Sequence, residues 1–277
     1  MAIITISREL AALGDETAHE LAKVLGCRFV NKQNLEDRIN TLGAADKKLA
    51  NYDEKKISFL GSFSNDRDDY LHYLRTAVFT EAGQGSCVII GRGASVILRK
   101  VPGVFSVFLA APPDIRIERV KNYFHCDERR AKQIIDQSDH DRETFHRYFF
   151  DSKWKDAGNY HLALNTGHLH PEVCAEIVKY MRDRVITDEA EAQNIARLGE
   201  LALEQGIKHN ILYEKEIPIH FLEVAISKEQ ISLFGVASAQ SLIEAAVNAA
   251  KEKASASFTV VSEIQVVHEV YTGSVNT

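Results

Sequence analysis

Residues 6–26 read ISRELAALGDETAHELAKVLG, which is the end of an apolar segment, a turn and an amphipathic helix. The apolar run at 2–6 predicts a buried strand. After the turn, Ala18 and Leu21 recur at helical spacing, and Gly26 is expected to end the helix. A strand that leads into a helix N-terminus presents unpaired backbone N–H groups and the positive end of the helix dipole. Both attract phosphate, so this turn is the first candidate site.

Length and composition indicate a globular chain. Its 277 residues are 45% hydrophobic and 26% charged, enough for one large domain or two modest ones. The net charge of −6 argues against a nucleic-acid partner, because displacing counterions needs clustered lysine and arginine. No segment approaches about 18 continuous apolar residues and no basic region precedes an apolar one, so we expect a cytoplasmic protein with no membrane partner. The spacing of cysteines and histidines predicts no metal site.

Apolar runs alternate with helical patterns over residues 1–184. Further strands are expected at 27–31, 86–91, 104–111 and 160–166, and helices at 33–58, at 70–84, after Pro112-Pro113 and from His170. This alternation predicts an α/β fold, a parallel sheet with helices on both faces. We expect 87–91 and 105–110 to be inner strands.

Residues 188–277 follow a different pattern. Helix, strand, strand, helix and strand succeed one another, which predicts a separate small α+β domain in the order α-β-β-α-β. The expected domains are therefore 1–184 and 188–277, with the boundary near Arg184–Thr187.

Six segments in the first part resemble, in order and spacing, the cytidylate kinase-like family of P-loop nucleoside monophosphate kinases. They are IITISRE (3–9), GDETAHELA (14–22), CVIIGRGASVIL (87–98), VFLAAPPDIRIERV (107–120), DHDR (139–142) and YHLALNT (160–166). Over residues 1–184 the resemblance implies a P-loop kinase fold and, if the protein is active, ATP and Mg²⁺ as cofactors.

The resemblance also implies a set of nucleotide-binding residues. Ser7, Arg8 and Gly14 match the phosphate-loop region, and Asn165 matches a stretch near the base on the triphosphate side. Arg129 and Arg130 match the mobile lid, whose arginines offset charge in the transition state. A solvated helical face is the alternative for the lid pair, and a turn that ends a strand is the alternative for Asn165.

Four further residues match the acceptor side of the family's site. Arg92 and Gly93 correspond to a segment whose arginine binds the acceptor phosphate, and an arginine fork suits phosphate oxygens. Asp139 and Arg142 match the end of a motif that holds the nucleotide base and phosphate. We expect Arg92 and Arg142 to point into one cleft. The alternative for Arg92 is an exposed arginine in a glycine turn. The alternative for Asp139 and Arg142 is an i,i+3 ion pair on the helix surface.

The phosphate loop departs from the family pattern. A working P-loop needs glycines, a lysine for the β/γ oxygens and a hydroxyl for magnesium. Here Gly14 is the one glycine of the turn, no lysine is present, and Asp15 and Glu16 are expected to cap the helix themselves. An ordinary capped helix is therefore an equally good interpretation. Arg8 is the nearby cation that could replace the lysine.

Residues 188–277 resemble a BON domain. The resemblance lies in the element order and in ISLFGVASAQSLIEAAVNAA (231–250), where Gly235 matches the family's L-x-G position. It implies a small module that binds a small ligand or a membrane surface, with no catalytic residues expected.

Three hypotheses for function follow. The hypothesis that the phosphate loop favours is a nucleotide-binding pseudokinase. Such a protein is a ligand-binding or regulatory module with weak or no phosphoryl transfer. The alternative is an active kinase that transfers the ATP γ-phosphoryl to CMP or a related monophosphate, and a structural protein is third. The expected partner is a nucleotide or another small phosphorylated ligand, and homo-oligomer formation is left open.

Overall fold

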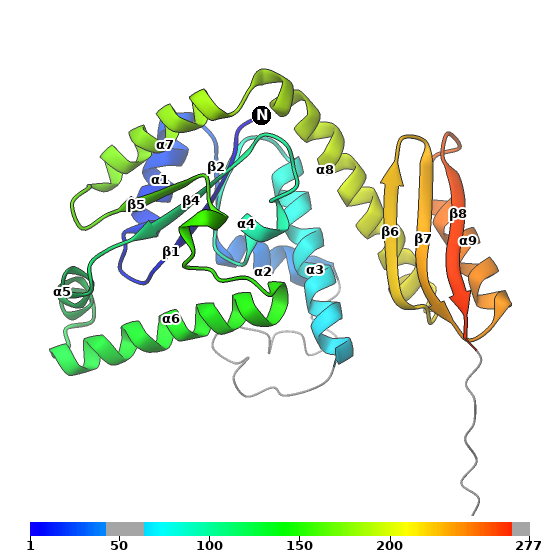
Figure 1. Cartoon of the computed structure of the whole chain (residues 1–277), viewed down its shortest axis with the longest axis horizontal. Coiled ribbons are helices and arrows are strands. Elements are labelled where there is room, and N and C mark those ends of the chain that lie inside the picture. The colour runs from blue at the N-terminus through cyan, green and yellow to red at the C-terminus, as the bar shows by residue number, and fades with distance from the viewer. Residues whose placement is uncertain (43–63, 268–277) are drawn as a thin grey trace, which may run out of the picture. The chain divides into compact units, whose positions relative to one another are not determined.

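The structure, a computed structural model, describes residues 1–42 and 64–267. Its first unit contains a five-stranded parallel sheet in the order β2-β3-β1-β4-β5 (Figure 1). The strands are β1 (Ile3–Arg8), β2 (Arg28–Val30), β3 (Cys87–Ile90), β4 (Val104–Ala110) and β5 (Leu162–Asn165). The parallel sheet and the inner positions of β3 and β4 confirm the sequence-based fold.

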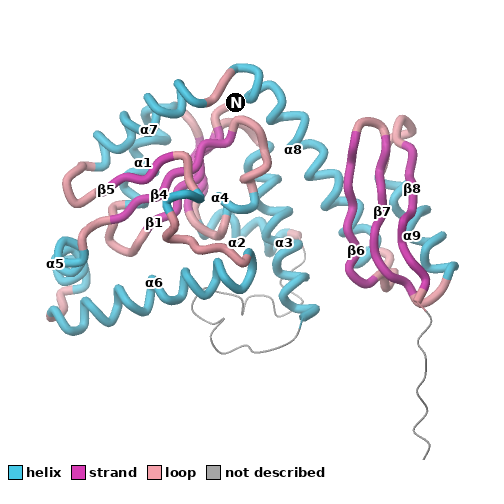
Figure 2. The backbone as a smooth tube through the Cα atoms, viewed as in Figure 1, coloured by secondary structure: helices cyan, strands magenta, loops and turns pink. Residues whose placement is uncertain are grey.

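Helices cover both faces of this sheet (Figure 2). They are α1 (Gly14–Leu25), α2 (Lys32–Thr41), α3 (Ser64–Gly83), α4 (Ala94–Ile97), α5 (Pro113–Phe124), α6 (Glu128–Phe150) and α7 (Pro171–Val185), with a 3₁₀ turn at Ala157–Asn159. Side chains alternate along β1, as the pleat requires. Ile4 and Ile6 share a core cluster with Leu21 of α1 and Val178 of α7, whereas Ser7 meets α4 on the other face.

Three helical segments differ in extent from the expectation, and the first is α3, which begins at Ser64 rather than at residue 70. The stretch expected at 33–58 is helical to Thr41, and its remainder from residue 43 lies outside the described residues. The segment after Pro112-Pro113 forms two helices rather than one. His125 adopts a left-handed φ of 51° that ends α5, and the Asp127 side chain accepts from Arg130 N to begin α6.

The chain forms two compact units, Met1–Leu198 and Gly199–Thr277, each defined by contacts among its own residues. The dividing point falls inside α8 (Asp188–His209), and the assignment of 1–184 and 188–277 as separate domains stays a prediction. Among the helices of the described residues, none has the length and hydropathy that crossing a membrane needs.

The second unit contains a three-stranded mixed sheet in the order β6-β7-β8. After α8 come a π-helical turn (Asn210–Glu214), β6 (His220–Ser227), β7 (Gln230–Ala237), α9 (Gln240–Lys253) and β8 (Thr259–Val266). β6 and β7 are antiparallel and β7 and β8 are parallel. The expected α-β-β-α-β order is confirmed.

Gly235 allows β6 and β7 to approach each other closely at an irregularity of β6. The register shifts between His220 and Glu223, and Phe221 there has a φ of 54° and is 83% exposed. Gly235 has a φ of 153°, and a Cβ on it would lie 2.9 Å from the His220 carbonyl oxygen. The glycine is therefore required by backbone conformation and by space together.

We predict that Gly235→Ala destabilises the protein by about 1–3 kcal/mol, because the added Cβ strains the backbone and meets a carbonyl that cannot move freely. Urea unfolding measures the change. The matched control is Gly199→Ala, where nothing lies within 4 Å of the added Cβ. That helical substitution should stabilise by about 0.5–1 kcal/mol. Equal effects of the two variants would contradict the prediction.

Candidate functional site

The loop between β1 and α1 lies at the carboxyl edge of the parallel sheet, where ligands of open α/β sheets bind. Two of its residues are not glycine and yet have left-handed backbone conformations, Ala11 with a φ of 59° and Leu13 with a φ of 52°. Each costs about 1 kcal/mol or more and persists only where the surroundings enforce it. The loop therefore keeps a conformation that its own residues disfavour.

Hydrogen bonds from outside the loop hold its carbonyl groups. Leu10 O accepts from Arg116 Nε at 2.8 Å, Ala11 O from Arg119 NH1 at 2.9 Å, and Ala12 O from Thr166 Oγ1 at 3.1 Å. Arg119 also donates to the Thr166 carbonyl at 2.7 Å. Two loop N–H groups are also engaged, that of Leu10 with Asp139 Oδ1 at 3.3 Å and that of Ala12 with the Glu9 carbonyl at 3.4 Å.

The N-terminus of α1 is not capped by its acidic residues, which corrects the expectation for Asp15 and Glu16. The N-cap residue is Leu13, whose side chain makes no capping hydrogen bond, and both acids are exposed in the first turn. Neither acid makes a capping hydrogen bond, and their carboxylates instead stand at the positive end of the helix dipole. Within the described chain, no acceptor pairs with the N–H groups of Leu13, Gly14, Asp15 or Glu16.

Arg8, at the end of β1, lies against two glycines of this edge. A Cβ on Gly14 would lie 2.9 Å from Arg8 Cβ, and a Cβ on Gly91 would lie 2.7 Å from Arg8 NH1. The side chain therefore runs from the loop toward the end of β3. Among the residues that the structure describes, none forms an ion pair or hydrogen bond with its guanidinium.

A cluster of five charged residues stands beside the loop. Arg116 NH1 lies 3.3 Å from Glu9 Oε1, and Arg116 NH2 lies 2.8 Å from Asp139 Oδ2. Lys155 Nζ lies 2.9 Å from the same oxygen of each acid, and Arg142 NH1 is 3.8 Å from Asp139 Oδ1. Asp139 Oδ1 also accepts from Leu10 N at 3.3 Å, so the cluster holds the loop directly.

The cluster shifts the pKa of two of its members. Burial opposes the charge of Asp139, but hydrogen bonds and charges from Lys155 and Arg116 outweigh it, and the pKa of this carboxyl lies below its ordinary value. Burial likewise opposes the charge of Lys155, and its bonds to Asp139 and Glu9 outweigh that and raise its pKa. Both groups are therefore ionised at neutral pH.

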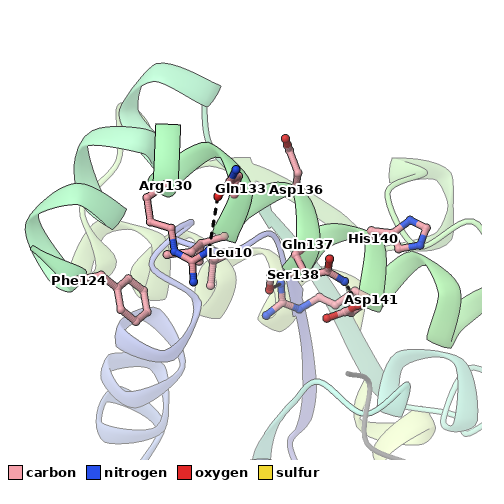
Figure 3. A pocket seen from close by; sticks show the side chains of 11 residues that line it. Leu10, Phe124, Arg130, Gln133, Asp136, Gln137, Ser138, His140 and Asp141 are labelled. Carbon is pink, nitrogen blue, oxygen red and sulfur yellow. Dashed lines mark hydrogen bonds between the residues drawn. The ribbon is translucent and has the colours of Figure 1, made fainter. Parts of the chain in front are cut away.

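A groove of about 1340 Å³ runs along one face of α6 next to the loop. Figure 3 shows Leu10 and Phe124 at one end of it and the polar side chains of α6 along it. Arg130 and Arg142, two of the expected site residues, line this groove. Arg92 is not among the described residues that line it, and the expectation of one cleft for Arg92 and Arg142 stays a prediction.

The expected acceptor-side residues at the end of β3 are engaged within the protein. Arg92 is buried and pairs with Glu36 of α2 through a charged hydrogen bond. Gly93 has a φ of 69°, and the Phe150 ring occupies the space that a side chain there would need.

The remaining expected residues are spread over the carboxyl edge and the lid. Ser7 Oγ bonds Ser95 Oγ at 3.2 Å on the α4 face. Asn165 Oδ1 accepts from Gly167 N at 2.9 Å and shapes the turn after β5. Arg129 and Arg130 are both exposed on the first turn of α6.

Sequence reasoning missed four residues that organise the loop: Glu9, Arg116, Arg119 and Lys155. The i,i+3 spacing of the two arginines on a predicted helix was the available signal, since it places them on one face. Lys155 follows Glu9 by 146 positions, and no local pattern connects them.

Comparisons with known proteins agree with this fold. The model of the cytidylate kinase-like family matches residues 3–168, more than half of the chain. No curated protein matches the sequence.

Among solved structures, an uncharacterized protein from Eubacterium ventriosum ATCC 27560 is 24% identical with a TM-score of 0.51, and the match covers 65% of this chain and 98% of that one. A shikimate kinase from Bacteroides thetaiotaomicron is 15% identical with a TM-score of 0.41, over 66% of this chain and 98% of that one. The match to the Eubacterium protein shows the fold.

We predict that Asp139 contributes stability that depends on pH. Because its folded pKa lies below the unfolded value near 3.8, the contribution is complete above that value and is lost as pH falls through the folded pKa. Urea unfolding of the wild type and Asp139→Asn from pH 7 to pH 3 should show a stability difference that shrinks below about pH 4. Asp136→Asn, an exposed position of α6, is the control. A difference that stays constant down to pH 3 would refute the assignment.

Proposed function

The chain belongs to the cytidylate kinase-like family and has its P-loop kinase-like fold, and we propose that it binds a nucleotide or another small phosphorylated ligand with little or no phosphoryl transfer. The observation that carries the proposal is Arg8. Its guanidinium lies between the loop and Gly91, and no described residue neutralises it. A partly buried cation without an anionic partner favours an anionic ligand.

The backbone of the loop supports the same ligand. The N–H groups from Leu13 to Glu16 are unpaired within the described residues and lie at the positive end of the α1 dipole. The left-handed conformations of Ala11 and Leu13 alternate with Ala12, as in nests that bind anions. Backbone donors with an arginine beside them suit phosphate oxygens, whatever the group attached to the phosphate.

Phosphoryl transfer requires more than binding. Catalysis of this type depends on positioned positive charge and on magnesium held by a loop hydroxyl. Glu16 occupies the place of that hydroxyl, and Thr17 next to it is fully buried. The loop therefore has backbone donors for a phosphate group, and it lacks the hydroxyl that holds magnesium in a working P-loop. Asp15 and Glu16 are exposed, and their negative charges would repel a triphosphate bound at the loop.

We extend the proposal to the whole chain as a ligand-binding or regulatory protein, a pseudokinase joined to a BON-like module. In this proposal the first unit senses the phosphorylated ligand. The alternative, an active kinase acting on CMP or a related monophosphate with ATP and Mg²⁺, requires the lid arginines Arg129 and Arg130 to close over the loop.

We predict that Arg8→Ala weakens ligand binding at least about tenfold, equivalent to about 1.4 kcal/mol. Calorimetric titration of the full chain with ADP, ATP·Mg, CMP and pyrophosphate measures it. Arg99→Ala is the matched control, because Arg99 is exposed and its guanidinium bonds Asn159 away from the loop. Unchanged affinity in Arg8→Ala would overturn the role of Arg8, and the absence of binding by the wild type would overturn the proposed function.

We predict that ADP production by the wild-type protein stays well below about 1 s⁻¹, the lower end of ordinary kinase turnover, with each nucleoside monophosphate as acceptor. A coupled assay measures it, with Arg8→Ala as the control for contaminating activity. Turnover at or above that rate which disappears in Arg8→Ala would establish the active-kinase alternative instead.

A further inference from the structure

We propose that Lys155 supplies, from outside the loop, the cation that the loop sequence lacks, and that its ammonium group contacts the phosphate of the bound ligand. The inference rests on the proposed function, since it concerns the same ligand. It assigns a phosphate contact to a residue in the connection after α6, which no motif of the sequence identifies.

The position of Lys155 carries the inference. Its Nζ lies 2.9 Å from Glu9 Oε1, and Glu9 is the residue that directly precedes the loop. Nζ also lies 2.9 Å from Asp139 Oδ2, and the other oxygen of that carboxylate accepts from Leu10 N. One bridging carboxylate therefore separates the ammonium group from a loop amide.

The charges of the cluster make one cation available. Glu9 and Asp139 carry two negative charges, and Arg116, Arg142 and Lys155 carry three positive ones. Arg116 bonds both acids, so each carboxylate keeps a buried cationic partner when Lys155 moves. Movement of the Lys155 ammonium group to a phosphate therefore leaves no buried carboxylate unpaired, and it avoids the large free-energy cost of such a charge.

Exposure identifies Lys155 as the mobile member. The side chains of Arg116 and Arg142 are 5% and 14% exposed, whereas that of Lys155 is 47% exposed. A lysine also has a flexible four-carbon stem and a compact charge that tolerates different directions of approach. Arg116 is fixed by three bonds to the loop and its neighbours, whereas Lys155 must exchange its two ion pairs for a ligand from a half-exposed position.

Trp154 provides a direct readout of this movement. It is the single tryptophan of the chain, is 2% exposed, and has Lys155 Nζ 5.3 Å from its ring centroid. Such a partly exposed cation–π contact is worth only about 0.5–1 kcal/mol, so a phosphate can displace it. Departure of the ammonium group from the ring should change the tryptophan emission.

The experiment compares Lys155→Met with Lys153→Met, an exposed lysine two positions earlier that has no part in the cluster. Tripolyphosphate and ADP are titrated into the full chain, with calorimetry and tryptophan emission as readouts. We expect Lys155→Met to bind at least about tenfold more weakly and to lose the emission change. Lys153→Met should behave as the wild type, and Lys155→Arg should recover most of the affinity because it keeps the charge.

The outcomes separate this inference from the proposed function. If the wild type binds and Lys155→Met binds equally well, the role of Lys155 is wrong while the proposed function stands. If the wild type binds neither probe, both are wrong. If Lys155→Met unfolds, Lys155→Gln keeps a donor to the two acids without the charge and takes its place. Equal binding by Lys155→Gln and Lys155→Arg would then also overturn the inference.

Discussion

The guanidinium of Arg116 is the contact on which the shape of the site depends. From a buried position on α5 it bonds Glu9 at the end of β1, the Leu10 carbonyl in the loop and Asp139 on α6. These three partners come from separate parts of the sequence, and one planar fork satisfies all of them. Without this contact, two carboxylates would lose their buried cation, and the loop would lose the bond that fixes its first carbonyl.

The sequence was sufficient where local patterns determine structure. β1, β3 and β4 are apolar runs bounded by turns, and their alternation with helical patterns predicted buried parallel strands. Gly26 ends α1 in a left-handed conformation, as its position after the last periodic residue predicted. The small α-β-β-α-β unit followed from periodicity in the same way. The family itself was identified from several short segments in order, because no single motif was complete.

The site was less predictable, since its geometry comes from distant partners. The sequence pattern places Asp15 and Glu16 near the start of a helix and suggests that they cap it. The N-cap residue is instead Leu13, because its left-handed conformation begins the helix at Gly14, one residue before the acids. A missing glycine indicates a missing phosphate cradle only if the backbone is free to choose its conformation. Here Arg119 and Thr166 hold the loop from outside, and neither contact has a local sequence signal.

The energies explain how a loop without its usual glycines keeps a strained form. Two left-handed residues cost about 1–3 kcal/mol each. Hydrogen bonds to charged groups contribute about 1.5–3 kcal/mol each, and the loop carbonyls receive two of them from arginines. The sums are comparable, so the strain can persist without a bound ligand. Loss of glycine and loss of phosphate binding are therefore separate events. Under the proposed function, a loop of this kind keeps its backbone donors while it lacks the lysine and the hydroxyl that phosphoryl transfer needs.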